Sequence, residues 1–346
     1  MNEITTIAID MAKRVFQVAA ESATGEELWN KRLRSREAMH AFVGQLEPPL
    51  VVGLEAGLGA QAWARAFAAR GLEVRVLPAQ RVAEHRSGAK NDRNDARAIL
   101  RALRDRSIHP VPVKTVEQLT MQALHRVRAG WQRRRTAIGN QIRGLLLEHG
   151  LCIAKGATAL QRSLEQVLPD ASVPIPDRLR DVIAELAGEW QGLAERLQAM
   201  DRELEQLAKR DPLARRLDTI PGVGALTATA MVCKGLEPQR FGSARDFAAY
   251  FGAVPDQHSS GNRVRLGGMS RRGDRYLRSL LINGAHAVIR QTRSDSTDPD
   301  RLRILRWKQR HGSKGAAVRL ANHNLRVIYA LMRDQVDHRN SGSTVS

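Results

Sequence analysis

Short apolar runs alternate with amphipathic segments along residues 1–110 of the chain. Five of the runs have the length and composition of strands, and they are Ile4–Ile9, Val15–Ala20, Leu28–Leu33, Leu50–Leu54 and Leu72–Leu77. The helical spacing of apolar residues predicts helices over Arg36–Leu46, Gln61–Ala69 and Asp92–Leu103. Because strands alternate with helices after a hairpin start, residues 1–110 are predicted to form an α/β domain, a mixed sheet covered by helices.

A second pattern begins after Pro110 and Pro112, and residues 111–210 are predicted to be a helical linker. A helix is expected from Val116 to about Gly150, and residues 168–178 are expected to form a loop. Apolar residues then alternate at spacings of four and three, as Leu179, Ile183, Leu186, Trp190, Leu193, Leu197, Met200, Leu204 and Leu207. This heptad seam favours a coiled coil with another copy of the chain, and the alternative is one amphipathic helix packed on its own domain.

Residues 211–346 form a third, mostly α-helical block. Ile220–Gly224 has the shape of a helix-hairpin-helix turn and precedes a helix rich in Ala and Thr. A loop rich in Gly, Ser and Arg follows at His258–Gly273, and helices are expected over Asp274–Arg290 and about Gly315–Met332. The predicted organisation is therefore α/β plus α, in three domains bounded at residues 110 and 210.

The net charge of the chain predicts what kind of partner it binds. The 346 residues include 55 Lys and Arg against 36 Asp and Glu, a formal net charge of +19, while 42% of residues are hydrophobic. A folded chain with this excess of positive charge is predicted to bind a polyanion, most often nucleic acid. Only 4% of residues are aromatic, so arginine contacts to phosphate are expected to dominate over base stacking. The basic helix supplies candidates in Arg126, Arg128, Arg133, Arg134, Arg135 and Arg143.

Other patterns exclude whole classes of protein. No run of eighteen apolar residues occurs, and the N-terminus lacks the pattern of a secretory signal. Cys152 and Cys233 are solitary, which excludes a disulfide framework and a cysteine zinc cluster. We therefore expect a soluble protein of a reducing compartment, with no membrane partner.

Four carboxylates occupy positions from which they can meet above one edge of the predicted sheet. Asp10 ends the first strand, Glu55 ends the fourth, and Asp92 and Asp95 share one face of the first turn of a helix. Hard oxygen ligands of this kind suit Mg²⁺, and two such ions would bind a scissile phosphate. Taken singly, Asp92 is better explained as a helix N-cap and Asp10 as a turn former. Taken together, the four are typical of ribonuclease H-like nucleases.

Basic residues and glycines supply candidate phosphate contacts. Lys90, Arg93 and Arg97 flank the two helical aspartates and would attract a nucleic-acid backbone. Gly222 and Gly224 would let a phosphate approach the turn closely, although a plain connection between helices explains them equally well.

A candidate nucleophile lies in the loop at His258–Gly273. Ser260 precedes Gly261, and cations are available from Arg263, Arg265, Arg271 and Arg272. From the residues alone, a basic loop that only binds the nucleic-acid backbone is the better explanation.

Several motifs in the same order resemble those of the DEDD transposases of insertion-sequence family 110, more closely its 1111 subgroup. They are Ile9–Lys13, Gly53–Ala56, Lys90–Ala96, Leu124–Arg128, Arg135–Ala137, Asn140–Leu146, Ile220–Gly224, His258–Gly261 and Ser270–Leu277. The resemblance covers almost the whole chain. One difference is that the family usually has Arg at the position of Asp256, which puts an acid near the phosphate.

The resemblance implies a RuvC-like N-terminal domain, a coiled-coil linker and a C-terminal transposase domain. Asp10, Glu55, Asp92 and Asp95 would hold Mg²⁺, and Ser260, or its neighbour Ser259, would attack DNA and form a phosphoserine intermediate. Members are similar to recombinases that move their own element between donor and target DNA, guided by a non-coding bridge RNA. The family is thought to build each site from the acidic domain of one subunit and the serine domain of another, which implies a homo-oligomer, a dimer or a tetramer of two dimers. The protein would be found in the bacterial cytoplasm, and on the nucleoid when active.

Two other functions are compatible with the residues. The first is a metal-dependent junction resolvase or nuclease that uses only the four acids, with water attacking the phosphate. The second is a scaffold that binds RNA or DNA without catalysis. Covalent attachment of DNA to a serine would distinguish the transposase from both.

Overall fold

The computed structural model describes residues 4–89, 91–257 and 265–336. These residues belong to two compact units, Met1–Glu117 and Gln118–Ser346. The boundaries expected at residues 110 and 210 stay predictions. Among the described helices, none is long and apolar enough to cross a membrane.

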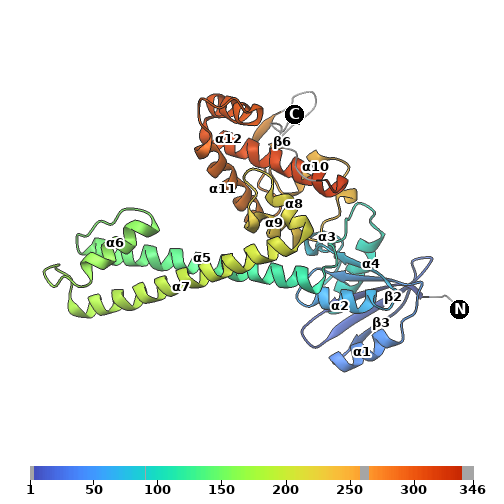
Figure 1. The fold of residues 1–346 in the computed structure, drawn as a ribbon. Coiled ribbons are helices and arrows are strands. Elements are labelled where there is room, and N and C mark those ends of the chain that lie inside the picture. The colour runs from blue at the N-terminus through green and yellow to red at the C-terminus, as the bar shows by residue number, and fades with distance from the viewer. Residues whose placement is uncertain (1–3, 90, 258–264, 337–346) are drawn as a thin grey trace. The chain divides into compact units, whose positions relative to one another are not determined.

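The first unit is built on a five-stranded mixed sheet, as predicted (Figure 1). The strands are β1 (Ile4–Met11), β2 (Phe16–Ser22), β3 (Glu27–Leu33), β4 (Val51–Glu55) and β5 (Glu73–Leu77). Their order across the sheet is β3-β2-β1-β4-β5. The first three strands are antiparallel, whereas β4 runs parallel to both β1 and β5.

Helices cover both faces of this sheet. They are α1 (Arg36–Gly44), α2 (Ala60–Ala68), α3 (Ala79–Glu84) and α4 (Asp92–Arg104). Large side chains such as Phe16 and Leu54 form a core with Met39 of α1 and Phe67 of α2. The six-residue helix α3 was not predicted, because it is too short to show a helical period.

Helix α4 packs on the opposite face, over a row of small residues. Ala8 pairs with Ala19 on one side and with Gly53 on the other. A Cβ atom on Gly53 would lie 2.4 Å from Cδ1 of Leu103 on α4. The small row therefore sets how closely α4 approaches the sheet, and with it the position of the first turn of α4.

The second unit is almost entirely helical. Its helices are α5 (Val116–Glu148), α6 (Ala157–Val167), α7 (Asp177–Arg210), α8 (Pro212–Asp218), α9 (Ala225–Val232), α10 (Ala244–Tyr250), α11 (Arg275–Gln291) and α12 (Pro299–Asp334), with a 3-10 turn at Pro238–Arg240. The first two residues of α5 precede Gln118, the residue at which the second unit begins. A small antiparallel ribbon joins β6 (Pro255–Gln257) to β7 (Leu266–Met269). Helix α12 begins earlier than predicted and is kinked at Gly312, whose φ is 68°.

The heptad seam of α7 is filled by the chain itself. Helices α5 and α7 run antiparallel side by side (Figure 1), with Arg128 bonded to Asp201 and Arg134 bonded to Glu189. Seam residues from Leu179 to Leu193 pack in one core with α5 and α6, and those from Met200 to Leu207 pack in a second core of the same unit. The seam is therefore buried within this chain, as in the alternative of an amphipathic helix packed on its own domain, and a coiled coil with another copy stays a prediction.

Candidate active site

The four predicted acids gather at one end of the sheet. Because Ile9 of β1 pairs with Leu54 of β4, Asp10 and Glu55 are the next neighbours along these parallel strands. Side chains alternate between faces, so both carboxylates lie on the face that carries α4. Asp92 and Asp95 occupy the first turn of α4.

The start of α4 is fixed by a side-chain cap. The N-cap is Asn91, whose side-chain oxygen accepts a hydrogen bond from the backbone N–H of Asn94 at 2.9 Å. The alternative explanation of Asp92 as the N-cap is therefore wrong. Asp92 is left with an ion pair to Arg32, whose Nη2 lies 3.6 Å from Oδ2 of the aspartate.

Burial and mutual repulsion perturb the protonation of two of the acids, Asp10 and Glu55. Burial, together with the negative charges of Asp95, Glu55 and Asp92, raises the pKa of Asp10 from its ordinary value of 3.8 to about 6. Burial also raises the pKa of Glu55, although the guanidinium of Arg86 opposes that effect. The cluster thus has the electrostatics of a site that favours an added cation.

Arg86 is a member of the site that the sequence did not reveal. Its Nη2 lies 3.2 Å from Oε2 of Glu55, and its Nε lies 3.0 Å from Oδ1 of Asp95. Arg86 follows α3 in a connecting segment with no periodic pattern. The one available signal was a cation six positions before Asp92 in the sequence.

The donor set fits Mg²⁺ in its chemistry, because all four groups are hard carboxylates and a cation would relieve their repulsion. The present side-chain arrangement is not a complete ligand set. Among the described residues, no three His, Cys, Asp or Glu side chains converge on a point that could hold a metal ion. Loading would require Arg86 to move from its position between Glu55 and Asp95.

The cations expected around Asp92 and Asp95 have different surroundings. Arg97 forms a two-pronged bond with Glu27, at 2.7 and 2.8 Å, so its charge is neutralised within the unit. Nη2 of Arg93 lies 3.5 Å from the carbonyl oxygen of Asn30. Lys90 lies outside the described residues.

The predicted serine loop is only partly described. Ser259, Ser260 and Arg263 lie outside the described residues, and β6 and β7 flank them. Arg265 and Arg271, which follow these residues in the sequence, are exposed. The nucleophilic role of Ser260, or of Ser259, stays a prediction.

The base of this loop is held by a buried arginine. One amino group of Arg278 donates hydrogen bonds to the carbonyl oxygens of Phe251 and Arg272, at 2.9 and 2.8 Å. The side chain of Arg272 itself is 81% exposed, and its Nη2 lies 3.8 Å from Oδ1 of Asp256. The unusual acid at position 256 thus faces a cation of the same chain.

The glycines of the Ile220–Gly224 turn have different surroundings. Gly222 has a φ of +87°, and a Cβ atom there would lie 3.1 Å from the backbone oxygen of Gly284 on α11. Close packing against α11 therefore gives Gly222 a structural reason to be glycine. Gly224 is exposed at the N-cap of α9 and stays a predicted phosphate contact.

The basic residues of α5 divide into packed and exposed groups. His125 lies within hydrogen-bond distance of the hydroxyls of Tyr276 and Thr229, which ties α5 to α11 and α9. Arg128 and Arg134 are bonded to acids of α7, as described above. Arg126 and Arg133 are exposed, and the structure shows no acid paired with either among the described residues.

Substitution of the two exposed arginines is expected to weaken the salt dependence of nucleic-acid binding. With Arg126→Gln and Arg133→Gln combined, the slope of log K against log salt should fall by roughly 1.4 to 1.8, because each lost phosphate contact removes about 0.7 to 0.9. Titrations at several salt concentrations measure the slope. Arg75→Gln is the matched control, since Arg75 is already paired with Glu73. An unchanged slope in the double variant would contradict the assignment.

Comparison with known proteins identifies the class. A family model described as "Transposase", for the DEDD transposases of IS110, matches residues 7–150, and a model described as "Transposase IS116/IS110/IS902 family" matches residues 214–298. A probable family 20 transposase of Pseudomonas aeruginosa is 37% identical, over 97% of this chain and 99% of that protein. The transposase for insertion sequence element IS1111A of Coxiella burnetii is 36% identical, over 98% and 92%.

The chain is thus a transposase, an enzyme that acts on DNA. It belongs to the IS110 family of insertion-sequence transposases, as its motifs indicated.

Proposed function

We propose that this transposase excises and inserts its own insertion-sequence element by a serine-dependent recombination that also needs the four acids. The observation that carries the proposal is the gathering of Asp10, Glu55, Asp92 and Asp95 at one end of the sheet, in a chain of this family. The strand order and the position of α4 support a RuvC-like assignment for this unit.

The chain's own residues would divide the reaction between them. The hydroxyl oxygen of Ser260 attacks phosphorus, an O–P bond to serine forms, and the bond from phosphorus to the leaving DNA oxygen breaks. The hydroxyl proton passes to a base, and the leaving oxygen takes up a proton. Arg265, Arg271 and Arg272 would hold the phosphate, and attack by a DNA hydroxyl on the phosphoserine would then rejoin the strands.

Asp10, Glu55, Asp92 and Asp95 would hold Mg²⁺, which supplies positive charge next to the phosphate when bound. We further propose that a non-coding bridge RNA pairs with donor and target DNA, so that the protein itself carries no code for the target. The active form would be a homo-oligomer, up to a tetramer of two dimers, on the nucleoid of a bacterial cytoplasm.

Trapping of the covalent intermediate tests this proposal. The protein is incubated with guide RNA, donor and target DNA and Mg²⁺, then denatured and examined for DNA that migrates with protein. We expect linked DNA in the wild type and its loss in Ser260→Ala and in Asp10→Ala. Ser259→Ala is the matched control, because it removes the neighbouring hydroxyl.

Each result of this experiment decides between functions. If linkage persists in Ser260→Ala but is lost in Ser259→Ala, the nucleophile is the neighbour. Free cleaved ends without linkage in the wild type, surviving Ser260→Ala, would indicate a junction resolvase or nuclease. Binding of the strands with no cleavage would indicate a scaffold that binds nucleic acid without catalysis.

A further inference from the structure

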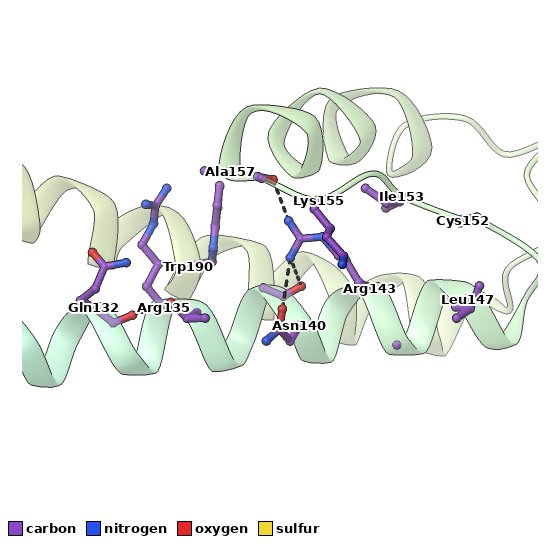
Figure 2. Close-up of a pocket in the computed structure, with 14 residues that line it drawn as sticks. Gln132, Arg135, Asn140, Arg143, Leu147, Cys152, Ile153, Lys155, Ala157 and Trp190 are labelled. Carbon is purple, nitrogen blue, oxygen red and sulfur yellow. Dashed lines mark hydrogen bonds between the residues drawn. The ribbon is translucent and has the colours of Figure 1, made fainter. Parts of the chain in front are cut away.

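A cavity of about 580 Å³ lies between the C-terminal half of α5, the segment leading into α6, and Trp190 of α7 (Figure 2). It lies entirely within the second unit. Its charged lining consists of Arg135, Arg143 and Lys155, and none of the described residues contributes a carboxylate to the lining. A volume of this size is in the range of small-ligand sites, about 300 to 1,000 Å³.

Arg135 is held in the cavity by an aromatic ring rather than by an acid. Its guanidinium lies 4.3 Å from the centre of the buried Trp190 ring, and Figure 2 shows the two side by side. The Nε atom is buried and has no hydrogen-bond partner among the residues that the structure describes. Burial also lowers the pKa of Arg135 from its ordinary value, which reflects the cost of a charge without a partner.

Arg143 uses its guanidinium to hold the loop that closes the cavity. Its Nη2 donates to the carbonyl oxygen of Gly156 at 2.6 Å, and its Nη1 donates to that of Gly139 at 3.1 Å. These acceptors are neutral, so they satisfy its hydrogen bonds without cancelling its charge. Within the described ranges, neither Arg143, Arg135 nor the exposed Lys155 forms an ion pair with a carboxylate.

The cavity also has an apolar side. Leu147 is 56% exposed, an unusual position for a large aliphatic side chain, and it lines the cavity together with Ile153 and Ala157. An inorganic anion would leave this surface in contact with water. A ligand that carries both a phosphate and a flat apolar ring would cover it and neutralise the cations as well.

We propose that this cavity binds one unstacked nucleotide of a nucleic-acid strand. The phosphodiester would lie between Arg135, Arg143 and Lys155, and the base would cover Leu147 and Ile153. Unpaired bases are commonly held on apolar, aromatic or guanidinium surfaces, and duplex bases are not available for this. The inference rests on the proposed role in nucleic-acid recombination, and it adds a specific site, away from the acids, for a single-stranded segment.

Cys152 offers a direct probe of occupancy, because it lines the cavity and is exposed, while Cys233 is buried. The rate of alkylation of Cys152 by iodoacetamide is followed by mass spectrometry with the full chain. The ligands are a mixed-sequence single-stranded RNA, the DNA of the same sequence, its duplex, and inorganic phosphate. At about ten times the dissociation constant of a strand, we expect alkylation to slow about tenfold. RNA and DNA strands are compared to learn which is the ligand.

Variants test the assigned contacts. Combined Arg135→Gln and Lys155→Gln should abolish protection, which is measured for each variant as the ratio of the alkylation rate of the free protein to that in the presence of the strand. Arg162→Gln is the matched control, since this exposed arginine of α6 does not line the cavity, and protection should persist. A strand with an abasic site at every position should protect at least several-fold less than the normal strand.

Three results would overturn the inference. They are full accessibility of Cys152 while fluorescence anisotropy shows the strand bound, equal protection by duplex or by phosphate alone, and equal protection by the abasic strand. None of them bears on the trapping of a phosphoserine intermediate. Failure of this site and failure of the proposed recombination are therefore separately visible.

Discussion

Asp10→Asn should abolish DNA cleavage while making the metal-free protein more stable. Loss of one ligand from the proposed Mg²⁺ site is expected to reduce the cleavage rate by roughly a thousandfold or more, since metal-ion catalysis supplies several kcal/mol to the transition state. In the absence of metal, the same change removes a carboxylate whose ionised form is destabilised by burial and by the charges of Asp95, Glu55 and Asp92. After allowance for solvent screening, the free energy of unfolding at neutral pH should rise by about 1 to 2 kcal/mol.

The sign of the pH dependence follows from the same carboxylate. The pKa of Asp10 is about 6 in the folded protein, against an ordinary value of 3.8. The folded state therefore holds more protons than the unfolded state between these two values, and the contribution of Asp10 to stability falls as the pH rises through them. Denaturant titrations in EDTA at pH 4 and pH 7 measure this change, which should be absent in Asp10→Asn.

Bound Mg²⁺ should offset the loss of folding stability that ionisation of Asp10 causes. Excess Mg²⁺ is expected to raise the melting temperature of the wild type at neutral pH and to leave that of Asp10→Asn almost unchanged. Asp181→Asn is the matched control, because Asp181 is an exposed residue of α7, and it should behave as the wild type. Mg²⁺-dependent stabilisation and cleavage that both survive in Asp10→Asn would rule out this carboxylate as a ligand.

Gly284→Ala should be among the most damaging single changes in the second unit. A Cβ atom at position 284 would lie 1.9 Å from the backbone oxygen of Gly222, so α11 or the turn before α9 would have to move. Overpacking of this kind commonly costs 1 to 3 kcal/mol, and backbone against backbone belongs at the upper end. We expect a loss of about 3 kcal/mol and a fall in melting temperature of roughly 6 to 10 °C.

The matched control for this change is another helix glycine. Gly188 lies on α7, and a Cβ atom there would meet nothing within 4 Å. Gly188→Ala should be neutral or stabilise the protein by up to about 1 kcal/mol, because alanine has the higher helix propensity. Thermal unfolding followed by circular dichroism compares the two variants. Equal stability of Gly284→Ala and Gly188→Ala would show that the contact between Gly222 and Gly284 yields easily.

The sequence was sufficient for most of the elements because burial imposes a period. Short apolar runs located all five strands of the first unit. Because Asp10 and Glu55 lie near the ends of two of these strands, the sequence also predicted that they meet at one end of the sheet. The helix predicted from about Gly315 is the second half of α12, which begins at Pro299 and is kinked at Gly312. Helix α3 was missed because six residues do not complete two helical turns.

Two features of the site depend on tertiary contacts that no local pattern encodes. Arg86 reaches Glu55 and Asp95 from a connecting segment, and its partners are known only once the sheet and α4 are assembled. A heptad pattern reports an apolar stripe without saying which chain covers it. The core around the C-terminal part of α7 combines residues of α5, which precedes α7 in the chain, with residues of α8 and α9, which follow it.

The internal burial of the α7 seam has a consequence for how this protein responds to concentration. Contacts within one chain do not weaken on dilution, so the α5 and α7 pair should keep its structure at concentrations where any assembly dissociates. Substitutions in the seam, such as those at Trp190 or Leu204, would then appear as folding defects rather than as changes in subunit number. A self-association surface, if one operates in transposition, must be sought on side chains that this pairing leaves exposed.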